Sequence, residues 1–414
     1  MIKKIRSSHA RVGMHVHEFC GSWMDHPFWR AKFTIRTPQE LQRIVSGGVA
    51  ELWIDTAKGL DVEGPDLDGG IGRQEVDAEI ERRLEVLATM PGTLEMLDAR
   101  VRPADDFNEA AALVRRSAPQ MTSLFNEARM GHAVDVRGCE ALVNEISESV
   151  FRNPEALISV ARLKRHDTYT YMHSVAVCGL MVALARQMGL KENLVKRAGL
   201  AGMLHDLGKA LTPLEILNKP GKLTEAEFAI MKTHPELGHA LLLEGQGAGP
   251  VVLDVCLHHH EKFDGTGYPH SLAGDKISLM AKMGTVCDVY DAITSVRPYN
   301  KGWDPGEALR RMAQWKGHFD PAVFQAFVKT VGIYPVGALV RLRSGVLAVV
   351  TGQNQQALLT PKVKVFYSAQ QGIYIEPYEV DLSSPMAQDK VLGCESPEDW
   401  NFKDLERLWN APLV

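Results

Sequence analysis

The sequence predicts a mainly α-helical protein, on the basis of the spacing of its apolar residues. Apolar residues recur every three or four positions from about residue 74 to 130, and helical patterns continue from 154 to about 331. Strand-like runs flank this region, in GVAELWIDT near the start and in ALVRLRSGVLAVVTGQ and KVKVFYS near the end. We therefore expect an all-helical central domain, with a smaller N-terminal α/β or β-rich domain and a C-terminal β appendage.

These patterns divide the chain into four segments. Residues 1–72 form an N-terminal accessory or regulatory domain ending in a linker, because residues 59–72 are rich in Gly and Asp. Residues 73–150 form connecting helices, residues 151–334 the central domain, and residues 335–414 a β-rich appendage and tail. Within the central domain, Thr224 and Glu227 predict a capping box at a helix start.

The composition restricts the partners and the compartment. The chain has 46 Lys and Arg against 51 Asp and Glu, so no overall positive field can recruit long nucleic acid. Six scattered cysteines without a C-x-x-C pair indicate reduced thiols. The start lacks a signal-peptide core, and the longest apolar run, about 175–185, is too short to span a bilayer. We expect a cytoplasmic protein without a membrane partner; the sequence leaves the oligomeric state open.

His and Asp side chains recur on successive predicted helices of the central domain. They are His173, His205, Asp206, His234, His258, His259, His260, Asp288 and Asp291. Imidazole and carboxylate together suit iron, manganese or zinc, and a carboxylate can bridge two ions. Adjacent helical residues diverge by about 100°, so His259 and His260 can serve different ions. One buried histidine alone is more often a hydrogen-bonded core residue, but an Asp beneath the apolar run GLAGMLHDLG needs a compensating cation or donor. The set favours a binuclear metal site.

Several motifs in this region resemble the HD-GYP subgroup of the HD phosphohydrolases. They are GLAGMLHDLGK, KPGKLTEAEF, MKTHPELG, HHHEKFDGTGYP, CDVYDAITSVRPY and FDPAVFQAF, and they cover about residues 155–330. DGTGYP following HHE is the most specific of them, since His-Asp pairs alone are common. The resemblance implies an HD-type catalytic domain that hydrolyses cyclic di-GMP with two divalent metal ions, iron or manganese.

The resemblance also implies roles for individual residues. The metal ligands would be His173, His205, Asp206, His234, His259, His260 and Asp288, with Asp206 bridging the two ions and His258 taking no part. Asp206 and Lys209 would be catalytic. Lys209 lies three residues after Asp206, on the same helical face, where its ammonium could contact a substrate phosphate. A solvated surface lysine is the alternative interpretation.

Three further residues are expected to bind substrate. Gly267 and Tyr268 belong to the DGTGYP loop, which in the family borders the active site and contacts substrate or a partner cyclase domain. The loop is also readable as a simple turn, which explains its glycines and proline but not its aromatic ring. Arg297, in RPY, resembles the family's phosphate or guanine contact; an exposed arginine in a surface ion pair is the alternative.

Two positions depart from the family pattern. Some members carry a Glu four residues before the first ligand histidine that helps to hold a third metal, and this chain has Tyr169 there. A neutral phenol is a poor replacement, so we expect two metals. The residue after RPY, often Lys in the family, is Asn300, followed by Lys301. Phosphate anchoring at that point is therefore in doubt.

The expected function is hydrolysis of cyclic di-GMP to linear pGpG, GMP or both, through a hydroxide that bridges two metals and attacks phosphorus in line. Two alternatives remain: hydrolysis of another nucleotide, and a non-catalytic cyclic di-GMP receptor. All seven expected ligand positions are filled, which disfavours a decayed site. The N-terminal region loosely resembles a domain often found ahead of HD-GYP, through RVGMHVHEFCGSWMDHPF and ELWIDTAKG, and suggests a sensory or partner-binding module.

Overall fold

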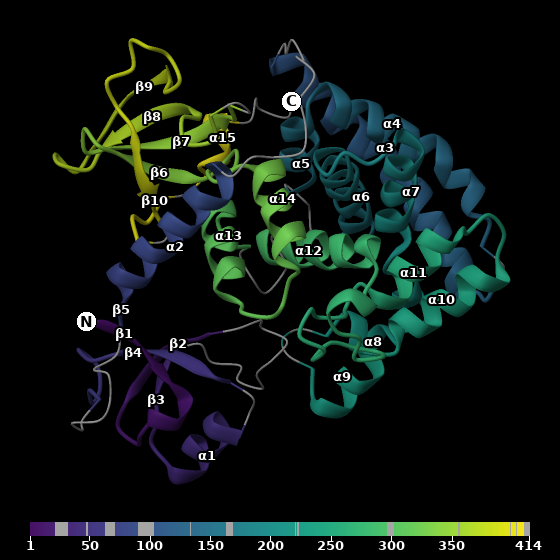
Figure 1. Ribbon diagram of the computed structural model, residues 1–414, viewed down its shortest axis with the longest axis horizontal. Helices are drawn as coiled ribbons and strands as arrows, with labels where there is room; N and C mark the ends of the chain where they lie inside the picture. The colour runs from purple at the N-terminus through teal and green to yellow at the C-terminus, as the bar shows by residue number, and fades with distance from the viewer. Residues whose placement is uncertain are drawn as a thin grey trace. The chain divides into compact units, whose positions relative to one another are not determined.

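A computed structural model gives the fold of the chain (Figure 1). It describes residues 1–20, 32–46, 49–62, 71–89, 103–132, 134–162, 169–219, 221, 223–295, 302–354, 357–397, 399–402 and 404–409. These residues form two compact units. The N-terminal unit comprises Met1–Val86 and Arg310–Lys316, and the larger unit comprises Leu87–Leu309 and Gly317–Val414.

The N-terminal unit is built on an antiparallel five-stranded sheet in the order β3-β2-β4-β1-β5. Its elements are β1 (Ile2–Arg6), η1 (Ser7–His9), β2 (His15–Phe19), β3 (Phe33–Thr34), α1 (Pro38–Ser46), β4 (Glu51–Asp55), β5 (Ile71–Gly72) and the start of α2 (Arg73–Thr89). Apolar residues of β2, β4 and α1, including Val16, Leu52 and Ile44, are fully buried in its core. The strand expected in GVAELWIDT is β4, and the end of the Gly- and Asp-rich stretch forms β5, which pairs with β1.

The last turn of α13 (Pro305–Gln314) also belongs to this unit. The Arg310 Nε lies 3.2 Å from the Glu81 Oε2 of α2, and both side chains are largely buried. The guanidinium of Arg311 is ion-paired with Glu18 of β2. Arg83 donates a hydrogen bond to the Ala313 carbonyl oxygen at 3.1 Å. Charged contacts therefore join α2 and β2 to a helix turn distant in sequence.

The larger unit is mainly helical. Its helices are α3 (Pro103–Arg129), η2 (Val136–Cys139), α4 (Glu140–Arg152), α5 (Pro154–Arg162), α6 (Tyr169–Gln187), α7 (Glu192–Leu204), η4 (Leu207–Leu211), α8 (Leu214–Leu217), α9 (Glu225–Met231), α10 (His234–Glu244), α11 (Pro250–His258), η5 (Gly274–Lys276), α12 (Leu279–Thr294), the first part of α13, and α14 (Pro321–Val331). The predicted capping box is present at α9, where Thr224 and Glu227 exchange hydrogen bonds. Helix α6 is buried almost all round, which explains its nearly unbroken apolar sequence.

The end of the chain adds a second antiparallel sheet, in the order β10-β6-β7-β8-β9, to the larger unit. Its strands are β6 (Leu339–Leu342), β7 (Val346–Gly352), β8 (Lys362–Ser368), β9 (Ile373–Asp381) and β10 (Val391–Cys394), followed by the short helix α15 (Glu406–Trp409). The mainly α fold with smaller β-containing flanks is thus confirmed. Across the residues that the structure describes, every helix is too short or too polar to cross a membrane.

Candidate metal centre

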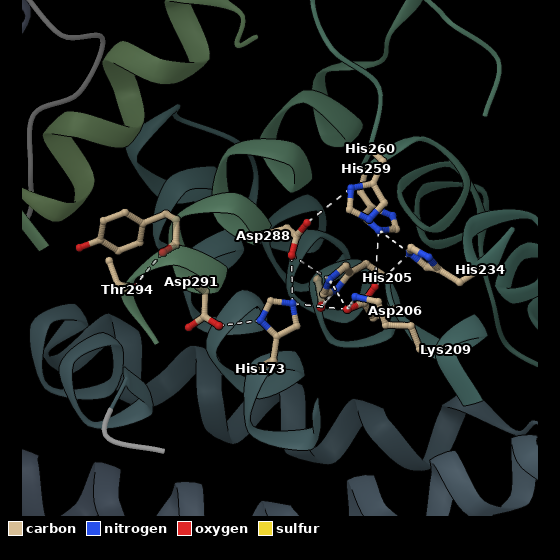
Figure 2. Close-up of polar contacts among 12 residues, drawn as sticks. His173, His205, Asp206, Lys209, His234, His259, His260, Asp288, Asp291 and Thr294 are labelled. Atoms are coloured by element: carbon tan, nitrogen blue, oxygen red, sulfur yellow. Dashed lines mark hydrogen bonds and ion pairs between the residues drawn. The ribbon is translucent and has the colours of Figure 1, made fainter. Parts of the chain in front are cut away.

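The seven predicted ligands lie together inside the larger unit, although they come from five separate segments (Figure 2). His173 is on α6, His234 begins α10 and Asp288 is on α12. The other four occupy turns that follow helices: His205 and Asp206 follow α7, and His259 and His260 follow α11. All seven side chains are at most 9% exposed. Helix ends can aim such consecutive side chains at a common point.

The side chain of Asp206 is shared by two groups of potential metal ligands. One group is Asp206, His234, His259 and His260, and the other is His173, His205, Asp206 and Asp288. Within each group the donor atoms lie within 4.8 Å of one another. The Oδ1 of Asp206 faces the Nε2 of His234 at 3.2 Å, whereas its Oδ2 faces the Nε2 of His173 at 3.4 Å. Asp206 therefore presents one oxygen to each group.

Three of the histidines are held in the same way by the backbone. His205, His234 and His259 each place Nδ1 near the carbonyl oxygen three residues earlier, at 2.8, 2.7 and 3.0 Å respectively. A carbonyl accepts but cannot donate, so each Nδ1 carries a proton and each Nε2 is the nitrogen that points toward the cluster. These Nε2 atoms all face the carboxylate of Asp206. Fixing the imidazole through its outer nitrogen is typical of metal-bound histidine.

A fourth histidine, His173, is oriented by a carboxylate instead of a backbone carbonyl. His173 Nδ1 lies 2.6 Å from the Oδ2 of Asp291, which is 1% exposed. The Nε2 of His173 lies 3.0 Å from the Oδ1 of Asp288. Asp288 and Asp291 are three residues apart on α12 and so lie on neighbouring positions of one helix face. One helix thus supplies both a potential ligand and the partner that orients another.

The charge balance of the cluster depends on close oppositely charged groups. Burial alone raises the pKa of a carboxyl, but the contacts of Asp206 with Lys209 and of Asp288 with His173 hold both pKa values well below the usual range. Burial lowers the pKa of His259 to about 4. For His205, burial lowers the pKa, but the Asp206 and Asp288 carboxylates together outweigh it and raise the pKa to about 10. Two buried carboxylates thus remain ionised among partly neutral imidazoles.

A metal ion would satisfy the donor atoms of the cluster better than hydrogen bonds among them do. Within the described part of the chain, the Nε2 of His205 and the Oδ1 of Asp206 are buried and make no hydrogen bond of acceptable geometry. Buried polar atoms without such a bond are costly, and a cation between them removes that cost. Imidazole nitrogens with carboxylate oxygens are ligands for iron, manganese and zinc. The His/Asp clusters therefore have the composition and geometry of a metal centre.

Lys209 contacts this centre from a different local structure than expected. Helix α7 ends at Leu204, and Lys209 lies in the 3-10 turn η4. In a 3-10 helix residues three apart eclipse each other, so the side chain still lies beside Asp206. Its Nζ is 2.5 Å from the Oδ2 of Asp206, and the side chain is 22% exposed. The ammonium therefore lies between the carboxylate and solvent.

The loop containing Gly267 and Tyr268 packs directly on the ligand-bearing segment. The Tyr268 ring stacks on His260, with centroids 4.7 Å apart and an interplanar angle of 27°. The Tyr268 N–H donates to the His260 carbonyl oxygen at 3.2 Å. A Cβ on Gly267 would lie 2.3 Å from the Lys262 nitrogen, so only glycine permits this close approach. The loop geometry is therefore tied to the metal centre.

Several predicted positions lie outside the residues that the structure describes. Arg297, Asn300 and Lys301 lie outside the described residues, and so does the side chain of Tyr169 at the start of α6. His258 is described and lies apart from both ligand groups, with its Nδ1 2.8 Å from the Oδ1 of Asp254.

Sequence reasoning missed the structural role of two carboxylates. The sequence pattern includes Asp291 among the His and Asp residues but indicates no role for it, whereas in the structure it orients His173. Glu261 was not singled out, although its buried carboxylate accepts hydrogen bonds from the backbone N–H groups of His270 at 2.7 Å and Leu272 at 3.0 Å. The spacing of Asp288 and Asp291, one helical turn apart, is a sequence signal that both side chains lie near the same site. No local sequence pattern indicates the role of Glu261.

Comparison with known proteins shows the family of this chain. Residues 147–323 match the family model described as HD domain, and residues 2–139 match a domain of unknown function, DUF3391. The chain is 52% identical to cyclic di-GMP phosphodiesterase PA4108 of Pseudomonas aeruginosa, over 99% of this chain and 96% of that protein. It is 38% identical to the cyclic di-GMP phosphodiesterase response regulator RpfG of Xanthomonas campestris, over 46% of this chain and 50% of that protein. A solved structure, Bd1817, an HDG"Y"P protein from Bdellovibrio bacteriovorus, matches with a TM-score of 0.44 and 15% identity, covering 79% of this chain and 98% of that one.

A helical HD domain with a shared buried carboxylate among histidines defines a metal-dependent phosphohydrolase. The chain belongs to the HD-GYP family of cyclic di-GMP phosphodiesterases.

Proposed function

We propose that this chain hydrolyses cyclic di-GMP to linear pGpG, GMP or both, at the centre around Asp206. The observation that carries the proposal is the position of Asp206, whose two oxygens face two separate groups of imidazoles. Tyr268, in the DGTGYP sequence at residues 264–269 (the GYP loop), stacks on one of these imidazoles. The names of the similar proteins from Pseudomonas and Xanthomonas support the same substrate.

The centre would hold two divalent metal ions, iron or manganese. Asp206 would bridge them, with His173, His205 and Asp288 on one side and His234, His259 and His260 on the other. Such ions supply a nucleophile from water at neutral pH and neutralise charge on the phosphate. Tyr169, in place of an acidic residue, is the basis for expecting two ions and not three, because a phenol remains protonated near neutral pH.

The protein's own residues would hold and orient the substrate. Lys209 reaches the Oδ2 of Asp206 from the exposed side, so its ammonium would be available to a phosphate oxygen when ions occupy the centre. Gly267 and Tyr268 would border the bound dinucleotide, and Arg297 would contact its phosphate or guanine. The same loop would be the contact for a partner cyclase domain. Burial of the ligands would exclude bulk water from the phosphate.

The test uses purified protein loaded with iron or manganese and incubated with cyclic di-GMP and cyclic di-AMP, followed by chromatography of the products. We expect turnover of cyclic di-GMP. His205→Ala and Asp206→Ala should lose both hydrolysis and bound metal, the latter measured by elemental analysis. Turnover that survives in either variant would refute the site. Tight binding without turnover in the metal-loaded protein would instead identify a receptor.

A second candidate substrate is another cyclic dinucleotide. The chain is 35% identical, over 42% of its length and 42% of the relative, to 3'3'-cGAMP-specific phosphodiesterase 1 of Vibrio cholerae. The metal centre acts on the phosphodiester and does not distinguish the bases, so base selection must come from other contacts. Adding 3'3'-cGAMP to the same assay separates the two: a larger kcat/KM for 3'3'-cGAMP would replace the proposed substrate.

A further inference from the structure

Two other histidines approach each other outside the central groups. The Nε2 of His258, at the end of α11, lies 3.2 Å from the Nδ1 of His270. The ring centroids are 5.4 Å apart and the rings are inclined by 58°, so the two imidazoles do not stack. Neither residue belongs to the groups around Asp206. The pair therefore brings together two nitrogen atoms edge to edge at a separate place.

The ring of His258 is held by a carboxylate. Its Nδ1 lies 2.8 Å from the Oδ1 of Asp254, one helical turn earlier on α11, and Asp254 accepts a second hydrogen bond from the hydroxyl of Ser278. Because Asp254 requires a donor, the Nδ1 of His258 carries the proton and the Nε2 carries the lone pair. A carboxylate on the outer nitrogen is the arrangement that orients metal-binding histidines.

The spacing of the two nitrogens suits a shared ion. Zinc binds imidazole nitrogen at about 2.0–2.1 Å in tetrahedral geometry, which places two such nitrogens about 3.3 Å apart. The observed 3.2 Å agrees with this value. The side chain of His258 is 17% exposed and His270 is exposed, so water can reach the remaining positions of an ion. We propose that His258 and His270 bind one divalent ion of the zinc class, separately from the centre around Asp206.

Such an ion would fasten the GYP loop to α11. Only Pro269 separates His270 from Tyr268 in the sequence. The backbone N–H of His270 already donates a hydrogen bond to Glu261. His258 directly precedes the ligands His259 and His260. Without an ion, the Nδ1–H of His270 donates to the Nε2 of His258. With the ion bound, that proton occupies the Nε2 of His270, facing water, so binding needs no net loss of a proton. Loop motion at Tyr268 would then be restricted at high zinc.

The test counts zinc bound at equilibrium, which does not depend on catalysis. Wild-type protein and His270→Asn are dialysed against a zinc series that extends above saturation of the central groups, and bound zinc is measured by elemental analysis. We expect one fewer weakly bound zinc ion per chain in His270→Asn and in His258→Asn. His132→Asn, which changes an exposed histidine, should bind as much as wild type. Equal zinc in wild type and His270→Asn would overturn the proposal.

A replacement ligand separates metal binding from loop structure. Cysteine thiolate binds zinc, so His270→Cys should regain the ion that His270→Asn loses, although it removes the imidazole. With cobalt in place of zinc, His270→Cys should also show sulfur-to-metal absorption in the near ultraviolet, absent from His270→Asn. Failure of His270→Cys to bind more metal than His270→Asn would show that the pair is only a hydrogen bond. Because the count is independent of turnover, an inactive but zinc-binding protein would leave this site standing and refute only the proposed function.

Discussion

The Nδ1 of His173 lies 2.6 Å from the Oδ2 of Asp291, while the Nε2 of the same ring faces Asp288. The two carboxylates therefore hold opposite edges of one imidazole. Asp288 would share an ion with His173, and Asp291 orients the ring.

Asp291→Asn should weaken metal binding without removing a ligand. The amide keeps the size of the side chain but loses the charge that favours the Nδ1–H of His173, and loss of such an orienting partner typically lowers metal affinity about 10–100-fold. Competition with a chelator would measure this. Asp275→Asn, at an exposed carboxylate, is the matched control. An unchanged metal affinity in Asp291→Asn would mean that packing alone fixes His173.

Gly208→Ala should destabilise the metal centre by steric means. A Cβ on Gly208 would lie 1.9 Å from the His234 carbonyl oxygen and 2.5 Å from the Gly238 nitrogen, both backbone atoms of α10. Overpacking of this kind costs about 1–3 kcal/mol or more, and here it separates Asp206 from His234. Urea unfolding would show the loss in free energy of unfolding. Gly138→Ala, where a Cβ meets no atom within 4 Å, should unfold much like wild type.

Glu261→Gln should weaken the hydrogen bonds that hold the residues following the GYP loop. The two carboxylate oxygens of Glu261 accept from the N–H groups of His270 and Leu272, and an amide can offer only one oxygen to these two donors. Loss of one such bond costs about 1.5 kcal/mol, so we expect KM for the dinucleotide to rise about tenfold with a smaller change in kcat. Steady-state kinetics against Glu215→Gln, at an exposed glutamate, would test it. A fall in kcat at constant KM would place Glu261 in the chemical step instead.

Stability should depend on pH through Glu155, which lies outside the metal centre. Its carboxylate accepts from the Gln353 N–H at 3.1 Å, and burial raises its pKa from 4.5 to about 7. The folded state therefore favours the protonated acid. Its contribution to the free energy of unfolding is fully present below about pH 4.5 and is lost as the pH rises through about 7.

The measurement is urea unfolding of wild type and Glu155→Gln at pH 5 and pH 8. The amide cannot ionise, so the variant should lose less stability between the two pH values than wild type does. Glu148→Gln, at an exposed residue of the neighbouring α4, should keep the wild-type difference. Identical pH dependence in wild type and Glu155→Gln would show that Glu155 does not titrate in this window.

The sequence predicted the helical core and brought the seven His and Asp residues into one hypothesis, because apolar periodicity and residue chemistry are local signals. It predicted Lys209 beside Asp206, although it could not indicate that η4, a 3-10 turn, would place it there. The partnership of His173 with Asp291 joins residues 118 positions apart, and that of Glu261 with Leu272 depends on the path of a loop. Such pairings are fixed by tertiary packing, which no local pattern encodes.

The N-terminal unit is discontinuous in sequence, since Arg310–Lys316 belongs to it together with Met1–Val86. Removing the first 86 residues would therefore strip Glu18 and Glu81 from Arg311 and Arg310 and leave two guanidinium groups on the remaining chain without those carboxylates. Conversely, the isolated N-terminal segment would lack a helix turn that completes it. The two parts of this protein are thus poorly suited to separation by simple truncation, and domain-swap experiments should carry Arg310–Lys316 along with the N-terminal sheet.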